Sequence, residues 1–180
     1  INLCTGPVAY YESDVLARPK NYEGDAFEEA MKACEKYGLD MYAWRVCWRM
    51  PEREVPAEII SRFVTEGRVQ VTVDGKVDPQ WLCPSHSENR RQEIEAFSEL
   101  ARKGAKYISY DYIRFPNDDY CYCERCKALF EKRIGIKVAK WPDDVRCNDS
   151  RTVFGPHYEA WHEFRRDLIS TLVRDASAAM

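Results

Sequence analysis

The sequence predicts an α/β fold built on a parallel β-sheet, and three observations lead to this prediction. Strand-like and helix-like segments alternate in the order βαβαβαβα, without internal repeats or low-complexity tracts. Apolar residues make up 45% of the chain and charged residues 32%, which is typical of a globular protein. A length of 180 residues is enough for one domain with a sizeable core. Right-handed crossovers between parallel strands are therefore expected.

The N-terminal part of the chain contains two predicted strand–helix units. Residues 1–4 are the end of a first strand. Asp25 is suited to cap a helix that Gly38 would end. A second strand covers residues 39–44, and a second helix begins near Pro56, a favourable residue in the first turn.

The C-terminal part continues the same alternation. Residues 69–73 alternate like a third strand, and the Asp-Gly pair at 74–75 predicts a turn. The spacing Ser85-x-x-Glu88 is typical of a capping box and predicts the start of the third helix. A long helix ends the chain, with one apolar face formed by Trp161, Phe164, Leu168, Leu172 and Ala176.

The most informative segment covers residues 107–116, Tyr-Ile-Ser-Tyr-Asp-Tyr-Ile-Arg-Phe-Pro. It reads as a buried strand that carries Asp111 close to its carboxyl end, with Arg114 directly after it. A buried, unpaired carboxylate costs stability. At the carboxyl end of a parallel strand, however, a carboxylate lies where α/β enzymes keep their reactive groups.

The number of predicted strands leaves two arrangements open. The chain contains about four strands, whereas a closed (β/α)₈ barrel has eight strands and about 250 residues. The final helix has no strand after it. From these residues alone, the chain is either an open α/β sheet or the first half of a barrel.

Five segments also match the pattern of a known family, in the family's order and over nearly the whole chain. They are residues 8–13 (Val-Ala-Tyr-Tyr-Glu-Ser), 37–44 (Tyr-Gly-Leu-Asp-Met-Tyr-Ala-Trp), 81–84 (Trp-Leu-Cys-Pro) with Asn-Arg at 89–90, 111–116 (Asp-Tyr-Ile-Arg-Phe-Pro) and 161–169 (Trp-His-Glu-Phe-Arg-Arg-Asp-Leu-Ile). In these segments the chain resembles the glycosyl hydrolase-like TIM-barrel proteins known as glycosyl-hydrolase-like family ten. The block at 111–116 is the most specific of the five.

The resemblance implies a parallel (β/α) TIM barrel that hydrolyses O-glycosidic bonds in a poly- or oligosaccharide by a carboxylate pair. Because the family's later strands have no counterpart here, residues 1–180 are expected to be a single barrel domain that is an incomplete, N-terminal half of a longer barrel. Two other functions are kept as alternatives. One is a catalytically inactive carbohydrate-binding barrel, and the other is an interaction module stabilised by a metal in its Cys-rich loop.

Asp111 is the predicted catalytic carboxylate, and Arg114 is expected beside it in the substrate site. Glycoside hydrolysis needs two carboxyl groups, about 5–5.5 Å apart for retention and about 6.5–9.5 Å apart for inversion. Glu12 and Asp74 also follow predicted strands, but the absent strands are the favoured source of the second acid. The competing interpretation is that Asp111 simply pairs with Arg114 or caps a loop.

Further substrate-binding residues are predicted from their positions after strands. Trp44, Arg45 and Trp48 follow the second strand; aromatic faces stack on sugar rings and Arg donates to hydroxyl or carboxylate groups. Tyr11 and Asn89 are predicted by the same positional argument. The alternative is that a Trp belongs to the core and that Arg45 forms an ion pair.

Four cysteines form a separate motif. Cys121, Cys123 and Cys126 lie within six residues, and Cys83 follows the preceding strand. Four thiolates at such spacing would suit a structural zinc ion, but only one Cys-x-x-Cys pair is present. We therefore favour one disulfide with free or buried thiols, and expect no cofactor; structural zinc remains the alternative.

Composition excludes some partners. A net charge of −3 and a pI near 5.7 argue against a general nucleic-acid binder, and no apolar run is long enough to span a membrane. The chain begins at Ile1 without an initiator Met, which indicates processing or excision from a longer protein. With eight Cys, this favours an exported, periplasmic or extracellular protein with a carbohydrate substrate.

Overall fold

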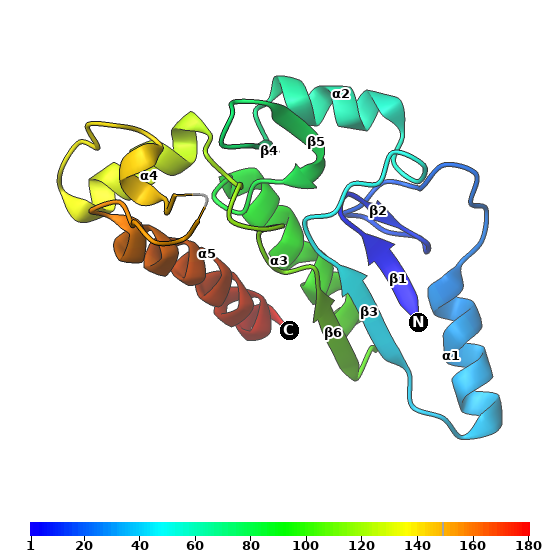
Figure 1. The fold of residues 1–180 in the computed structure, drawn as a ribbon. Coiled ribbons are helices and arrows are strands. Elements are labelled where there is room, and N and C mark those ends of the chain that lie inside the picture. Colours follow the sequence, from blue (N-terminus) through cyan, green and yellow to red (C-terminus); the bar gives the residue numbers. More distant parts are fainter. Residues whose placement is uncertain (149) are drawn as a thin grey trace.

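The computed structural model describes residues 1–148 and 150–180, and it contains a four-stranded mixed sheet, a separate two-stranded ribbon and five α-helices. Figure 1 shows the helices and the ribbon arranged around the sheet. The elements are β1 (Asn2–Thr5), β2 (Val8–Ala9), α1 (Ala26–Tyr37), β3 (Tyr42–Val46), α2 (Ala57–Thr65), β4 (Val69–Val71), β5 (Val77–Leu82), α3 (Ser87–Arg102), β6 (Tyr107–Asp111), α4 (Glu124–Ile134), the 3₁₀ helix η1 (Asp143–Val145) and α5 (Tyr158–Ala179).

The fold class expected from the sequence, a parallel TIM-barrel type, is wrong. The sheet has the order β2-β1-β3-β6, in which β1, β3 and β6 are parallel but β2 is antiparallel to β1. The third predicted strand does not join this sheet. Its residues form β4, which pairs antiparallel with β5 in the ribbon. The protein is therefore a small mixed α/β domain.

Two tight turns account for the difference. Gly6 adopts a left-handed conformation with φ of +49°, and a Cβ there would lie 2.0 Å from the carbonyl oxygen of Arg49. This lets the chain reverse from β1 into β2. The second turn brings the backbone N–H of Thr72 within 2.9 Å of the oxygen of Lys76, with Gly75 at φ of +80°. An Asp-Gly turn between short strands is a hairpin signal, and here it closes the ribbon.

The helices form largely where the sequence predicts them. Asp25 caps α1, because its Oδ1 accepts the N–H of Glu28 at 2.8 Å, and Gly38 ends that helix in the left-handed region. The expected capping box at the start of α3 is replaced by a different cap. His86 is the N-cap residue, and its Nδ1 accepts the N–H of Glu88 at 3.2 Å.

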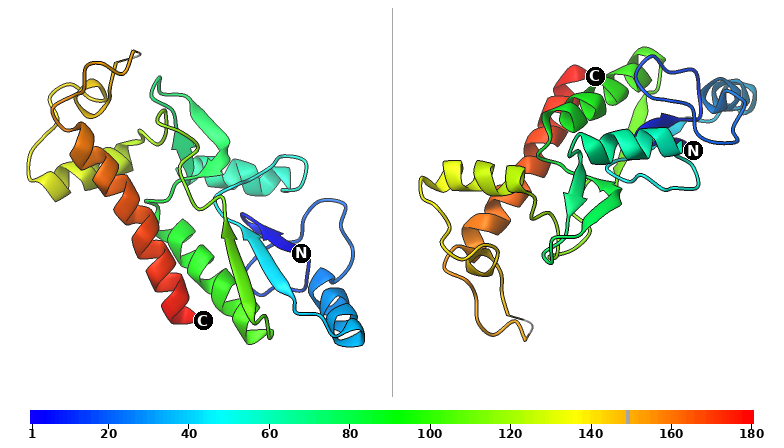
Figure 2. Two further views of the ribbon diagram at one scale, coloured as in Figure 1. Left: turned by 60° about the horizontal axis from the view of Figure 1, so that its bottom comes forward. Right: turned by 90° about the horizontal axis from the view of Figure 1, so that it is seen from above.

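One face of the main sheet is covered by α3. Buried Arg45 of β3 pairs with Glu93 of α3 at 2.8 Å, and Phe97 stacks on Tyr110 of β6 with ring centroids 4.2 Å apart. In turn, α5 packs along α3 (Figure 2). The opposite face carries the exposed side chains of Tyr42 and Trp44. The sheet therefore has one helix-covered face and one open face.

The core consists of three apolar clusters. One lies between the sheet, the ribbon and α2, and a second joins β1 and β3 to α1 and α3. The third packs α4 and α5 around Trp161 and includes three cysteines. The ribbon and α2 lie beyond the carboxyl ends of the parallel strands (Figure 1). Among the described residues, no helix combines the length and apolarity needed to cross a membrane.

Candidate functional site

The carboxyl ends of the three parallel strands lie side by side. Thr5 of β1 is paired with Val46 of β3, and Val46 is paired in turn with Asp111 of β6. The predicted position of Asp111 at the end of a parallel strand is therefore confirmed. Because side chains alternate along a strand, Trp44 lies on the same face as Asp111, two residues back along β3.

Trp44 and Asp111 are in direct contact. The indole Nε1 of Trp44 donates to Oδ2 of Asp111 at 3.0 Å, and the backbone N–H of Tyr112 donates to Oδ1 at 2.8 Å. Trp44 keeps 41% of its surface exposed. The carboxylate is thus fixed through both oxygens, while Trp44 remains partly open to solvent.

A groove of about 620 Å³ opens at these strand ends. It runs between the open sheet face and the chain that links β3 to α2. Trp44 and Tyr112, the two donors to Asp111, both line it. The other lining residues are Asn2, Thr5, Val46, Arg49, Pro51, Glu52, Arg53, Glu54 and Gln80.

Backbone hydrogen bonds fix the wall that carries Arg49. The N–H of Cys47 donates to the oxygen of Asp111 at 2.7 Å, and the N–H of Met50 donates to the oxygen of Gln80 at 2.9 Å. The segment between them therefore bridges the sheet and the ribbon. The sequence prediction missed Arg49, although it lies only one residue beyond the predicted Trp48.

Two guanidinium groups stack on aromatic rings beside the groove. Arg49 lies 5.0 Å from the ring centroid of Trp81, and Arg114 lies 5.1 Å from that of Tyr112. Arg114 also donates to the oxygen of Pro116 at 3.2 Å. Arg114 is therefore held against Tyr112, the residue that follows Asp111, and its hydrogen bond goes to the backbone.

Acidic residues also line the groove. Glu54 accepts from the hydroxyl of Tyr10 at 2.5 Å and from Nε of Arg53 at 2.9 Å. Burial, together with this hydrogen bond to Glu54, raises the pKa of Tyr10 to about 12. The two acids considered from the sequence lie elsewhere: exposed Glu12 pairs with Arg18, and Asp74 pairs with Lys76 in the ribbon turn.

Four predicted substrate-binding residues are buried away from the groove. Arg45 is fully buried. Desolvation is the largest single influence and lowers its pKa, but the attraction and hydrogen bond of Glu93, together with Cys4 and Cys47, raise the pKa well above the usual value. Trp48 is fully buried in the core. The hydroxyl of Tyr11 donates to Glu99 at 2.9 Å, and Asn89 accepts from Nε of Arg68 at 2.7 Å. Arg45, Tyr11 and Asn89 thus have hydrogen-bond partners within the fold, and Trp48 packs in the apolar core.

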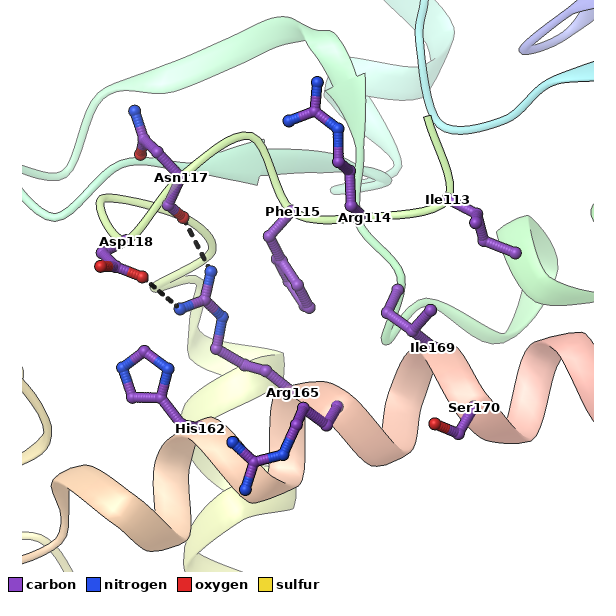
Figure 3. A pocket seen from close by; sticks show the side chains of 10 residues that line it. Ile113, Arg114, Phe115, Asn117, Asp118, His162, Arg165, Ile169 and Ser170 are labelled. Carbon is purple, nitrogen blue, oxygen red and sulfur yellow. Dashed lines mark hydrogen bonds and ion pairs between the residues drawn. The ribbon is translucent and has the colours of Figure 1, made fainter. Parts of the chain in front are cut away.

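A second pocket of about 420 Å³ lies between α5 and the loop after β6. Figure 3 shows Arg165 reaching from α5 to this loop, where it donates to the oxygen of Asn117 at 2.7 Å and lies 3.4 Å from Oδ1 of Asp118. Phe115 points toward α5, whereas Arg114 points away from it. Arg165 thus anchors the loop that follows Asp111.

The four cysteines singled out in the sequence come together. Their sulfur atoms all lie within 4.8 Å of one another, which is a group that could hold a metal ion. We call this group, Cys83, Cys121, Cys123 and Cys126, the cysteine cluster. All eight cysteines of the chain are free, so the disulfide expected from the sequence is not formed.

Hydrogen bonds among the thiols shift their pKa values in opposite directions. Contacts from the other three sulfurs, that of Cys121 first, hold the pKa of Cys123 far below its usual range. The hydrogen bond with Cys123 raises the pKa of Cys121, and that with Cys121 raises the pKa of Cys126.

Comparison with known proteins gives a structural likeness but no family. No protein-family model matches the chain, and no curated protein matches it. Among solved structures, the fold is similar to part of the cold-adapted β-galactosidase from Rahnella sp. R3, with a TM-score of 0.60 and 12% sequence identity. The match covers 99% of this chain and 29% of that one. At this identity the likeness concerns the fold alone; the chain spans less than a third of that protein's length.

Proposed function

We propose that the protein is glycoside hydrolase-like and that its groove binds a poly- or oligosaccharide. The observation that carries this proposal is the contact between the exposed indole of Trp44 and the carboxylate of Asp111 at the strand ends. An aromatic face beside a fixed carboxylate suits a sugar ring held next to a reactive group. The fold likeness to part of a β-galactosidase supports the same class of protein.

Polar side chains that can hydrogen-bond sugar hydroxyls line the groove together with Trp44. They include Arg49 and Gln80. The guanidinium of Arg49 donates to ring or hydroxyl oxygens, and the side-chain amide of Gln80 both donates and accepts.

In the proposed reaction Asp111 acts as one carboxyl of the pair. Its two hydrogen bonds hold the carboxylate in one orientation, which suits a nucleophile or base. The second carboxyl is needed about 5–9.5 Å away, depending on the stereochemistry. Glu52 and Glu54 line the same groove and are our candidates for it.

Binding is tested by titrating β-linked galacto-, cello- and malto-oligosaccharides while recording tryptophan fluorescence. We expect saturable binding of at least one of them, and about fivefold weaker binding by Trp44→Ala, since an aromatic stacking contact contributes about 1 kcal/mol. Tyr37→Ala is the matched control, because Tyr37 is an exposed aromatic residue at the end of α1. Equal affinity of Trp44→Ala and wild type would contradict the proposed site.

Catalysis is tested by incubating the protein with the oligosaccharide that binds. We expect hydrolysis that Asp111→Asn lowers by about 10²- to 10⁴-fold, while affinity is kept. Full activity of Asp111→Asn would remove Asp111 from the mechanism. Binding without turnover would instead support the alternative function, a carbohydrate-binding domain that lacks chemistry.

A further inference from the structure

The cysteine cluster gathers ligands from two separate segments of the chain, one at Cys83 and one at residues 121–126. Cys83 directly follows β5, Cys121 lies in the loop after β6, and Cys126 lies in the first turn of α4. Each of these three is fully buried. Cys123, the N-cap residue of α4, is partly buried and completes the cluster.

The spacing of the sulfurs fits a tetrahedron around one ion. Four ligands at about 2.3 Å from a zinc ion lie about 3.8 Å from one another. The Sγ of Cys83 lies 3.9 Å from that of Cys123 and 3.6 Å from that of Cys126. A disulfide would instead bring one pair to about 2.05 Å and leave the other two thiols aside.

Polar groups around the cluster are placed to support thiolates. The backbone N–H of Val71 points at the Sγ of Cys121 at 3.3 Å. The N–H of Cys126 points at the Sγ of Cys123 at 3.5 Å, in the first turn of α4, where the helix dipole favours negative charge. Oγ of Ser85 lies 3.1 Å from the Sγ of Cys83. Such outer contacts orient the ligands of metal sites.

We propose that the cysteine cluster binds one zinc ion as a closed, structural tetrathiolate site. Zinc is the ion that most often occupies four cysteine ligands in a structural site, and four protein ligands leave no position open for a substrate. The inference goes beyond the carbohydrate function and does not depend on it.

The bound ion would join two parts of the fold. Val71 and Cys83 belong to the ribbon region, whereas Cys121 and Cys126 belong to the lobe formed by α4 and α5. The same lobe holds the aromatic cluster around Trp161, which includes Phe130 and Phe164. The zinc site would thus fasten the aromatic lobe, and the loop that follows Asp111, to the ribbon.

The first test is the metal content of the full chain, purified under reducing conditions without chelators. We expect one zinc ion per chain, measured by inductively coupled plasma mass spectrometry. Less than about a tenth of an equivalent, or an equivalent of iron in place of zinc, would overturn the proposal. A disulfide between any two cysteines of the cluster in the intact protein would overturn it as well.

The second test assigns the ligands. Cys121→Ser is expected to lose the zinc, whereas Cys34→Ser, which changes a partly buried cysteine on α1, keeps it. Because a ligand variant can fail to fold, the wild-type protein is also titrated with a mercurial reagent in the presence of a colorimetric zinc chelator. We expect zinc to appear as the thiols are blocked. Retention of zinc by Cys121→Ser, or by the fully blocked protein, would contradict the site.

Discussion

The indole Nε1 of Trp44 donates a 3.0 Å hydrogen bond to Oδ2 of Asp111, and this contact links the open faces of β3 and β6. The two residues lie on adjacent parallel strands, with Trp44 two residues before the end of β3 and Asp111 at the end of β6. The contact therefore sets the orientation of the carboxylate relative to the aromatic face. Trp44 therefore has two proposed roles, which are stacking on a sugar ring and orienting the carboxylate of Asp111. The first prediction separates them.

Trp44→Phe keeps an aromatic face but removes the donor to Asp111. We expect the affinity for the bound oligosaccharide to change by less than about threefold, because stacking is retained. We expect kcat/KM to fall about tenfold, which corresponds to about 1.4 kcal/mol, because the carboxylate loses one of its two fixing contacts. The measurement is steady-state kinetics beside a binding titration. An unchanged kcat/KM would show that the hydrogen bond does not position the carboxylate.

The buried pair of Arg45 and Glu93 predicts a large effect on stability. Both side chains are almost fully buried, and Nε of Arg45 lies 2.8 Å from Oε2 of Glu93. Glu93→Gln leaves the guanidinium charge buried without a counter-charge, so we expect the free energy of unfolding to fall by about 3–5 kcal/mol. Urea denaturation measures it. The control is Glu28→Gln, which breaks an exposed pair with Lys32 and should leave the midpoint unchanged. A loss below about 1 kcal/mol for Glu93→Gln would contradict the importance of the pair.

The raised pKa of Tyr10 leads us to expect a loss of stability at alkaline pH. Burial and the hydrogen bond to Glu54 raise the pKa of Tyr10 from 10 to about 12 in the folded protein. Its contribution to stability is therefore complete below pH 10 and lost as the pH rises toward about 12. Tyr10→Phe removes this ionisation, so the free energy of unfolding of the variant should fall less steeply over that range. Parallel pH profiles for the two proteins would refute the expected linkage.

We expect removal of the proposed zinc ion to lower the melting temperature of the protein. At a free zinc concentration about 1,000-fold above Kd, binding stabilises the folded state by about 4 kcal/mol. For a chain of this size the expected shift is about 8–16 °C. Thermal unfolding is compared before chelation, after chelation and after zinc is restored. Trp161 packs beside Tyr122 next to the cluster, so its fluorescence should change with the metal. Identical melting curves in all three states would contradict a structural role.

The sequence correctly predicted two features, the position of Asp111 at a strand end and the proximity of four cysteines. Residues 107–111 form the expected strand, β6, with the carboxylate of Asp111 at its carboxyl end. The strand was expected to be buried, which is wrong, because each of its five residues is exposed or only partly buried. The spacing of Cys121, Cys123 and Cys126, with Cys83 after an earlier strand, also predicted their proximity. The first prediction depends on a short-range pattern, whereas the approach of Cys83 depends on the order of the strands that precede the two cysteine segments.

Small errors in strand position changed the assignment of the site. The second strand was expected at 39–44, but β3 spans Tyr42–Val46, so Trp44 and Arg45 lie within it. Because side chains alternate between the faces of a strand, Trp44 faces the groove and Arg45 faces α3. No pattern in the sequence distinguishes these neighbours without the exact strand boundary.

Local sequence patterns could not predict which distant strands pair with one another. The alternating residues of β4 suit a strand, but they do not say whether the partner lies in the main sheet or in a hairpin. Likewise, Arg49 reaches the groove because backbone bonds of Cys47 and Met50 join the sheet to the ribbon. These contacts depend on the tertiary arrangement of β3, β5 and β6.

The most direct test of the proposed carbohydrate site is a crystal structure of the protein with a bound oligosaccharide. The structure should show a sugar ring against the indole of Trp44, with the glycosidic oxygen close to the carboxylate of Asp111 and hydroxyl groups on Arg49 or Gln80. A sugar bound only outside the groove, or an empty groove at saturating oligosaccharide in crystals that leave it open, would contradict the proposed function.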